Sequence, residues 1–165
     1  MLSGETAAGK YPVEAVATMS RIAIEAEKNM DYARFLAQRE LDTTDDLSSA
    51  IAYAACTTAI EINAAAIISV TISGSTCKKV AGLKPPVPIL GGSMHDDVCR
   101  KMSLMWGVQS MHVDKKETED ELFEEAIRVS KQAGYIKSGD RVVIVAGVPL
   151  GKVGSTNMIR VVYVE

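Results

Sequence analysis

The stretch AAIISVTISGSTCKKVAGLKPPVPIL, residues 65–90, decides the fold that this sequence predicts. Residues 65–71 are a short apolar run typical of a buried strand, and residues 75–84 fit a short helix that Pro85 would end. Residues 87–90 are a second apolar run and predict a second strand. Because a helix connects them, the two strands are expected to lie parallel in one sheet.

The same alternation continues to the end of the chain. Further helices are expected over residues 96–106 and 117–134, and further strands over residues 108–113, 141–147 and 158–164. The loop between the last two strands is too short for a crossover helix, so the final strand is expected to be antiparallel. The sequence therefore predicts an α/β fold over residues 44–165: a three-layer αβα sandwich with a mostly parallel five-stranded sheet.

The first 43 residues follow a different pattern. Apolar residues such as Val16 and Met19 recur at helical spacing after Pro12, which predicts an amphipathic helix ending near Met30. Residues 31–43 are polar and are interpreted as a connector with a short helix. Thr43 and Asp46 fit a capping arrangement for the next helix, whose small residues suit close packing.

Composition narrows the class of protein. The 165 residues are 47% hydrophobic and 24% charged, with a net charge of -3. These values are typical of one globular domain and argue against a nucleic-acid partner, which would need a basic surface. No apolar run is long enough to cross a membrane. The three cysteines fit reduced thiols in a cytoplasmic protein, and the two histidines are not placed for zinc, so no metal site is expected.

Two further interpretations concern single features. Trp106 is expected to anchor the core at the end of its helix, and the acidic run from Glu117 to Glu125 is expected to form a solvated helix face. No nucleophile–base pair, carboxylate pair or metal cluster stands out. The sequence by itself therefore shows no complete active site.

The loop after the first strand is the best candidate for a binding site. It offers Thr71, Ser73, Ser75 and Thr76 as hydroxyl donors around Gly74, at the carboxyl end of a strand and the start of a helix. Ligands of open α/β sheets bind at such ends, and free amides at a helix start favour anions. Lys78 and Lys79 would add positive charge nearby. The same residues also fit an ordinary Ser/Gly turn with a helix cap.

A second loop, residues 147–157, could close over a phosphate that the first loop holds. It contributes Lys152, Gly154, Ser155 and Thr156. It also fits a flexible hairpin. The two loops follow the first and fourth strands, which are commonly neighbours in such sheets, and this favours one shared phosphate site.

The start of the chain, GETAAGKY at residues 4–11, is one residue short of a P-loop. Tyr11 stands where a magnesium-binding Ser or Thr is needed, and almost no strand precedes Gly4. The longer stretch MLSGETAAGKYPVEAV, residues 1–16, instead resembles the end of the catalytic barrel of the pyruvate kinase family. Residues 69–90, 104–113 and 138–161 also resemble that family, so the resemblance covers essentially the whole chain.

The resemblance implies a function. Residues 1–30 would be the last loop and helix of a (β/α)8 barrel, with Ser3, Gly4 and Glu5 supporting its active-site face. Residues 44–165 would be the regulatory domain of an enzyme that transfers a phosphoryl group from phosphoenolpyruvate to ADP, using magnesium and potassium. The family's catalytic and metal-binding residues would lie upstream, in the rest of a longer chain. This chain alone would then bind no metal and be inactive.

The resemblance also implies partners. Two sets of residues match the family's effector-phosphate loops: Thr71, Ser73, Gly74, Ser75 and Thr76 in the first loop, and Lys152, Gly154 and Ser155 in the second. Family members are usually homotetramers. Leu122 stands where fructose-bisphosphate-regulated animal enzymes have arginine. A sugar monophosphate or a nucleotide monophosphate is therefore as good a candidate effector. The alternatives are a stand-alone phosphate-binding module and an oligomerisation domain that binds nothing.

Overall fold

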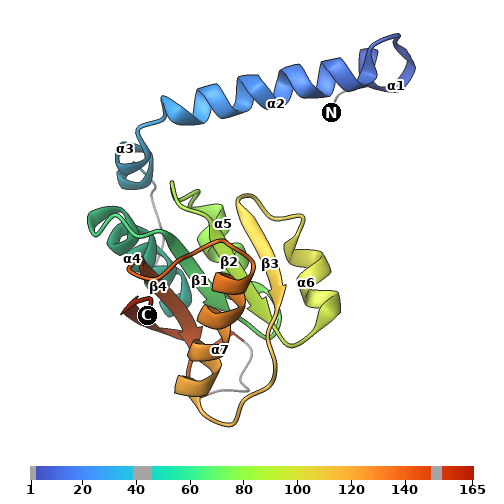
Figure 1. The fold of residues 1–165 in the computed structure, drawn as a ribbon. Helices are drawn as coiled ribbons and strands as arrows, with labels where there is room; N and C mark the ends of the chain where they lie inside the picture. The colour runs from blue at the N-terminus through green and yellow to red at the C-terminus, as the bar shows by residue number, and fades with distance from the viewer. Residues whose placement is uncertain (1–2, 39–45, 150–153) are drawn as a thin grey trace. The chain divides into compact units, whose positions relative to one another are not determined.

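The structure is a computed structural model, and it describes residues 3–38, 46–149 and 154–165 (Figure 1). The chain forms two compact units, Met1–Asp31 and Tyr32–Glu165. The helices are α1 (Glu5–Ala8), α2 (Pro12–Lys28), α3 (Tyr32–Ala37), α4 (Leu47–Glu61), α5 (Ser75–Gly82), α6 (Asp96–Met102) and α7 (Glu119–Gln132). The strands are β1 (Ala66–Val70), β2 (Ile89–Ser93), β3 (Val108–His112), β4 (Arg141–Gly147) and β5 (Thr156–Tyr163).

The first unit consists of α1 and α2. Pro12 occupies the first turn of α2, where its missing N–H costs nothing, and the helix ends at Lys28, two residues before the predicted end. None of its residues is buried, and large apolar side chains are exposed along it: Val13, Val16, Met19, Ile22 and Ile24. The assignment of this unit to the end of a barrel stays a prediction.

The second unit contains the predicted five-stranded sheet, in the order β3-β2-β1-β4-β5. β1 pairs in parallel with both β2 and β4, and β2 pairs in parallel with β3. β5 pairs antiparallel with β4, which confirms the prediction from the short connection between them. After β3 the chain returns to the other side of β1, so the strand order reverses between β1 and β4.

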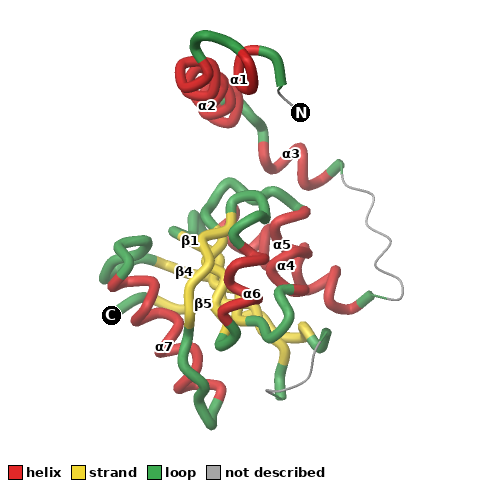
Figure 2. Tube along the Cα trace, turned by 90° about the vertical axis from the view of Figure 1, so that its right-hand side faces the viewer, coloured by secondary structure: helices red, strands yellow, loops and turns green. Residues whose placement is uncertain are grey.

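Helices cover both faces of the sheet, which makes the three layers predicted from the sequence. Figure 2 shows α7 on one side of the strands and α4, α5 and α6 on the other. Side chains alternate across each strand, so Ile67 of β1 joins the core beneath α4 and α5, whereas Ile68 joins the core beneath α7. Both are fully buried. On α4 the contact face is built from small residues: Ala52, Ala55, Cys56 and Ala59.

The structure corrects three local predictions. The helix over 96–106 ends at Met102, and Trp106 is half-buried and belongs to neither core, while Met102 itself is fully buried. Asp46 is the N-cap of α4, so the helix starts later than Thr43 suggested, and Thr43 lies outside the described residues. The acidic run is not wholly solvated, because α7 buries Glu125.

Candidate functional site

The loop between β1 and α5 forms a tight turn around Gly74. Its φ of +83° lies in the left-handed region, which glycine adopts without strain. The Gly74 N–H donates to Thr71 Oγ1 over 3.0 Å, so the buried Thr71 side chain fixes the turn. The predicted hydroxyls therefore sit on a defined backbone.

The other hydroxyls of this loop lie close to one another. Ser73 Oγ donates to Ser75 Oγ over 3.2 Å at an exposed position. Thr76 is buried, and its Oγ1 lies 2.6 Å from Thr156 Oγ1 at the start of β5. Thr76 and Thr156 are 80 residues apart in sequence, so this hydrogen bond joins the two candidate loops directly.

The second loop reaches this place because β4 lies beside β1. A third element, α4, also contacts this loop: Ser48 Oγ at the start of α4 donates a hydrogen bond to the Gly154 carbonyl oxygen over 3.1 Å. A Cβ on Gly147 would lie 2.9 Å from the backbone of Ser155, so the two ends of the loop meet only because residue 147 is glycine. Lys152, the predicted cation of this loop, lies outside the described residues.

A cavity of about 850 Å³ opens between these loops, at the carboxyl ends of β1 and β4. This volume lies within the range of small-molecule sites, and the position is where the strand order reverses, as ligand sites of open α/β sheets do. Its lining includes all the predicted hydroxyl residues of both loops: Thr71, Ser73, Ser75, Thr76, Ser155 and Thr156. The structure thus brings both predicted loops to one cavity.

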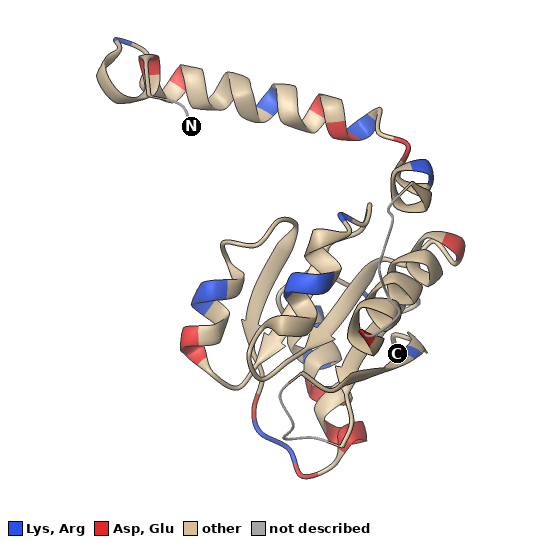
Figure 3. Ribbon diagram, turned by 180° about the vertical axis from the view of Figure 1, so that it is seen from behind, with Lys and Arg blue, Asp and Glu red and all other residues tan. Residues whose placement is uncertain are grey.

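The far wall of the cavity was not predicted. Ser93 and His95 come from the end of β2, and Lys115, Lys116 and Glu117 come from the segment between β3 and α7. Figure 3 shows this segment as a basic stretch with acidic residues on either side. The strand order would have predicted this wall, because β2 and β3 end at the same edge of the sheet as β1. That order is known only from the fold.

The lysines after the first loop do not supply the charge that was expected. Lys79 forms an ion pair with Asp46 at the start of α4 and donates to Ser49 Oγ over 2.9 Å. Hydrogen bonding from Lys79, and then from Ser49, lowers the pKa of Asp46 from its ordinary value of 3.8 to about 2. Lys78 is exposed and does not line the cavity. The cations that the structure places at the cavity are Lys115 and Lys116.

The predicted residues of the first unit, Ser3, Gly4 and Glu5, lie at the start of α1. Ser3 is exposed, Gly4 precedes α1, and Glu5 Oε1 accepts a hydrogen bond from the Tyr11 N–H over 2.7 Å. This bond closes the GETAAGKY loop on itself. Within residues 3–38, 46–149 and 154–165, no three His, Cys, Asp or Glu side chains are grouped to hold a metal ion. In the same ranges, no helix is long and apolar enough to span a membrane.

The fold and the cavity define a class of protein: an α/β domain whose open, mostly parallel sheet holds a polar small-molecule cavity at its reversal point. Residues 49–162 match the family described as "Pyruvate kinase, alpha/beta domain". The chain belongs to this family, as its sequence motifs predicted.

Individual relatives agree. The chain is 42% identical over 165 residues to the pyruvate kinase of Clostridium acetobutylicum, covering 100% of this chain and 35% of that protein. It is 41% identical over 161 residues to the pyruvate kinase of Geobacillus stearothermophilus, covering 98% of this chain and 27% of that protein. The pyruvate kinase of Staphylococcus aureus is 38% identical over 161 residues, with 98% and 28% covered. The chain thus spans between 27% and 35% of the length of these relatives.

Proposed function

We propose that this chain is the regulatory portion of a pyruvate kinase and that its cavity binds a phosphorylated small-molecule effector. The observation that carries the proposal is the convergence of two hydroxyl-rich loops on one cavity at the carboxyl ends of β1 and β4. The Thr76–Thr156 hydrogen bond holds those loops together, so the site needs little rearrangement to receive an anion.

The proposed phosphate lies against the start of α5. Ser73, Ser75 and Ser155 supply hydroxyl donors, and the first backbone amides of α5 add a partial positive charge. Thr71 acts indirectly, because its Oγ1 accepts the Gly74 N–H and so shapes the turn. Lys152, outside the described residues, is proposed to close over the phosphate.

The rest of the effector occupies the remainder of the cavity. Apolar side chains such as Val70, Val113 and Leu122 line the cavity alongside the polar residues of the far wall. A volume of about 850 Å³ accommodates either a sugar monophosphate or a nucleotide monophosphate, so both classes stand as candidates.

The activity proposed for the whole protein is phosphoryl transfer from phosphoenolpyruvate to ADP, giving pyruvate and ATP in the cytoplasm. The support is the 42% identity to a relative named pyruvate kinase, of which this chain spans 35%. Magnesium and potassium are proposed to serve that whole reaction. Among the described residues, no three His, Cys, Asp or Glu side chains are grouped to hold a metal ion. Ser3, Gly4 and Glu5 are proposed to support the barrel face of the active site.

A homotetramer is proposed for the whole protein, with the regulatory domains meeting through exposed apolar surface. Val161 and Tyr163 on the edge strand β5 are 45% and 68% exposed. The second candidate function, an oligomerisation domain that binds no ligand, rests on this same surface. Ligand binding distinguishes the two.

The experiment is a thermal-shift titration with inorganic phosphate, glucose 6-phosphate and AMP. A ligand that binds only the folded state raises the melting temperature, by an amount that grows with the logarithm of its concentration relative to its dissociation constant. We expect a rise with at least one organic phosphate, and a smaller rise in Thr71→Ala, Ser73→Ala and Thr76→Ala. Ser138→Ala is the control, because Ser138 is exposed before β4, at the opposite end of that strand from the cavity. If the melting temperature rises equally in the three loop variants and in the control, the loop between β1 and α5 does not bind the ligand.

A further inference from the structure

Glu125 is a buried carboxylate behind the far wall of the effector cavity. It lies in the second turn of α7 and is 7% exposed, although its neighbours in sequence suggested a solvated face. Buried carboxylates are uncommon unless they are paired, so its partners indicate what it does.

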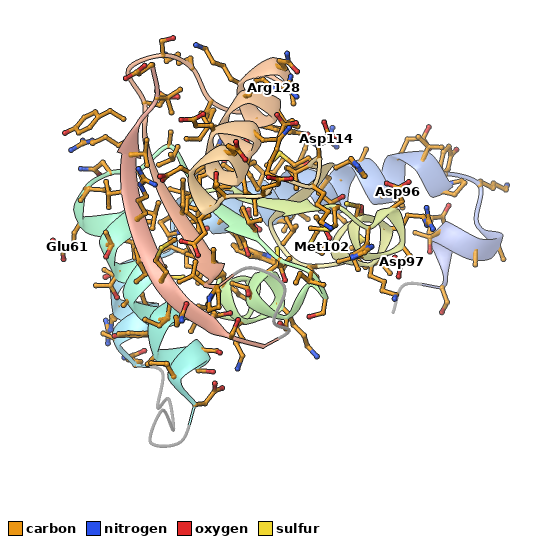
Figure 4. All side chains as sticks on the ribbon, turned by 90° about the horizontal axis from the view of Figure 1, so that it is seen from below. Glu61, Asp96, Asp97, Met102, Asp114 and Arg128 are labelled. Carbon is orange, nitrogen blue, oxygen red and sulfur yellow. The ribbon has the colours of Figure 1, made fainter. Side chains whose placement is uncertain are left out.

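Arg128 is the main partner of Glu125. Arg128 Nε donates to Oε2 over 2.9 Å and Nη2 donates to Oε1 over 2.7 Å, a two-point contact within α7. This pairing, more than any other contact, lowers the pKa of Glu125, and a backbone hydrogen bond at Asp114 acts in the same direction. Figure 4 labels both Arg128 on α7 and Asp114 on the segment that follows β3.

Lys116 is the second partner, and it is held less tightly. Its Nζ lies 3.9 Å from Glu125 Oε2, whereas a charged N–H···O bond spans about 2.7–2.9 Å. The Lys116 side chain is 31% exposed and also lines the effector cavity. It is therefore a cation with a buried carboxylate on one side and the effector cavity on the other.

We propose that Glu125 sets the affinity of the cavity for anions by drawing Lys116 back from it. The inference rests on the proposed function of the cavity as a phosphate-ligand site. Lys116 lines the same cavity as the α5 loop, so an anion bound in that cavity and Glu125 both attract its ammonium group.

Arg128 makes this competition possible. When Lys116 turns to the ligand, the two-point contact with Arg128 still neutralises Glu125, so no buried charge is left unpaired. Lys115 also lines the cavity, so a second cation faces the ligand whichever way Lys116 turns. Glu117 also lines the cavity. Its negative charge repels an anionic ligand, so it lowers the affinity of the cavity further.

The test is calorimetric titration of the full-length protein with glucose 6-phosphate and, separately, with AMP. Glu125→Gln keeps the shape of the side chain and removes its charge. We expect the dissociation constant to fall about three-fold, the scale of a partly exposed ion pair. Lys116→Met should weaken binding, and Glu125→Gln should have no further effect in the Lys116→Met background. Glu61→Gln, an equal charge change at an exposed residue at the end of α4, should leave the constant unchanged.

Each contrary result has a distinct meaning. Unchanged or weaker binding in Glu125→Gln would overturn the inference while leaving the phosphate site in place, as would unchanged binding in Lys116→Met. A gain that persists in the double variant would also overturn it, because the effect would then not pass through Lys116. Failure of the wild type to bind either probe would overturn the proposed function and this inference together.

Discussion

Gly147 decides whether the two ends of the second loop can approach each other. Its hydrogen-only side leaves room for Ser155, whose backbone would lie 2.9 Å from any added Cβ. The register of the β4–β5 pair also shifts between Ala146 and Gly147, and both residues line the cavity. The absence of a Cβ at residue 147 therefore allows β4 and Ser155 to approach as closely as the site requires.

Gly147→Ala is predicted to destabilise the domain and to weaken effector binding. The methyl group must push Ser155 and its backbone away, at a cost of about 1–3 kcal/mol in unfolding free energy. Chemical denaturation and the thermal-shift titration measure the two effects. Gly82→Ala on α5 is the control, because an added Cβ there meets no atom within 4 Å. Equal stability of the two variants would contradict this account of residue 147.

At the scale of elements, α4 and α5 are tied together at the ends that border the site. Asp46 caps α4 by accepting the Ser49 N–H over 3.3 Å, and it also pairs with Lys79 of α5. The next residue but one, Ser48, holds the Gly154 carbonyl. The start of α4 thus contacts both elements that carry the candidate phosphate site.

Asp46→Asn is predicted to lower the melting temperature at neutral pH, because asparagine still caps the helix but cannot pair with Lys79. The folded state depresses the pKa of Asp46 from 3.8 to about 2, so its charge stabilises the fold above pH 3.8. This contribution is lost as the pH falls through about 2. Melting curves of both proteins should therefore converge over that interval.

Glu61→Gln, at the other end of α4, is the matched control. It removes a carboxylate from the same helix without touching α5, and it should not lower the melting temperature at neutral pH. A constant difference between wild type and Asp46→Asn down to pH 2 would show that the Lys79 pair is not its cause.

The whole molecule consists of two units of different character. The second unit has two cores, one on each face of its sheet, whereas α2 in the first unit buries none of its residues. The chain spans between 27% and 35% of the length of two relatives named pyruvate kinase. Together these facts support the proposal that α2 packs against a part of the protein outside this sequence.

The 165-residue chain alone is predicted to catalyse no transfer from phosphoenolpyruvate to ADP, while still binding the effector. A coupled assay of ATP formation checks the first point, and the thermal-shift titration checks the second. The full-length protein is the positive control, and a blot of source cells should show a band far above 17.7 kDa. Turnover by the short chain would place catalytic groups within it and overturn the proposed division of labour.

Much of this protein was readable from sequence because its main patterns are local. Apolar runs such as residues 65–71, separated by helix-forming stretches and Pro85, determined the order of elements and the parallel sheet. The short connection before β5 determined the antiparallel edge. The motifs at both ends of the chain determined the family. Each of these depends on residues close together in sequence.

Only the tertiary structure decided which distant groups meet. It joined Thr76 to Thr156, paired Lys79 with Asp46, and placed Lys116 between the cavity and a buried Glu125. No local pattern reports these contacts, because they depend on how the strands order and the helices pack. Sequence spacing can place a hydroxyl or a charge on a loop, but the partner it finds is set by the neighbouring element that the fold brings beside it.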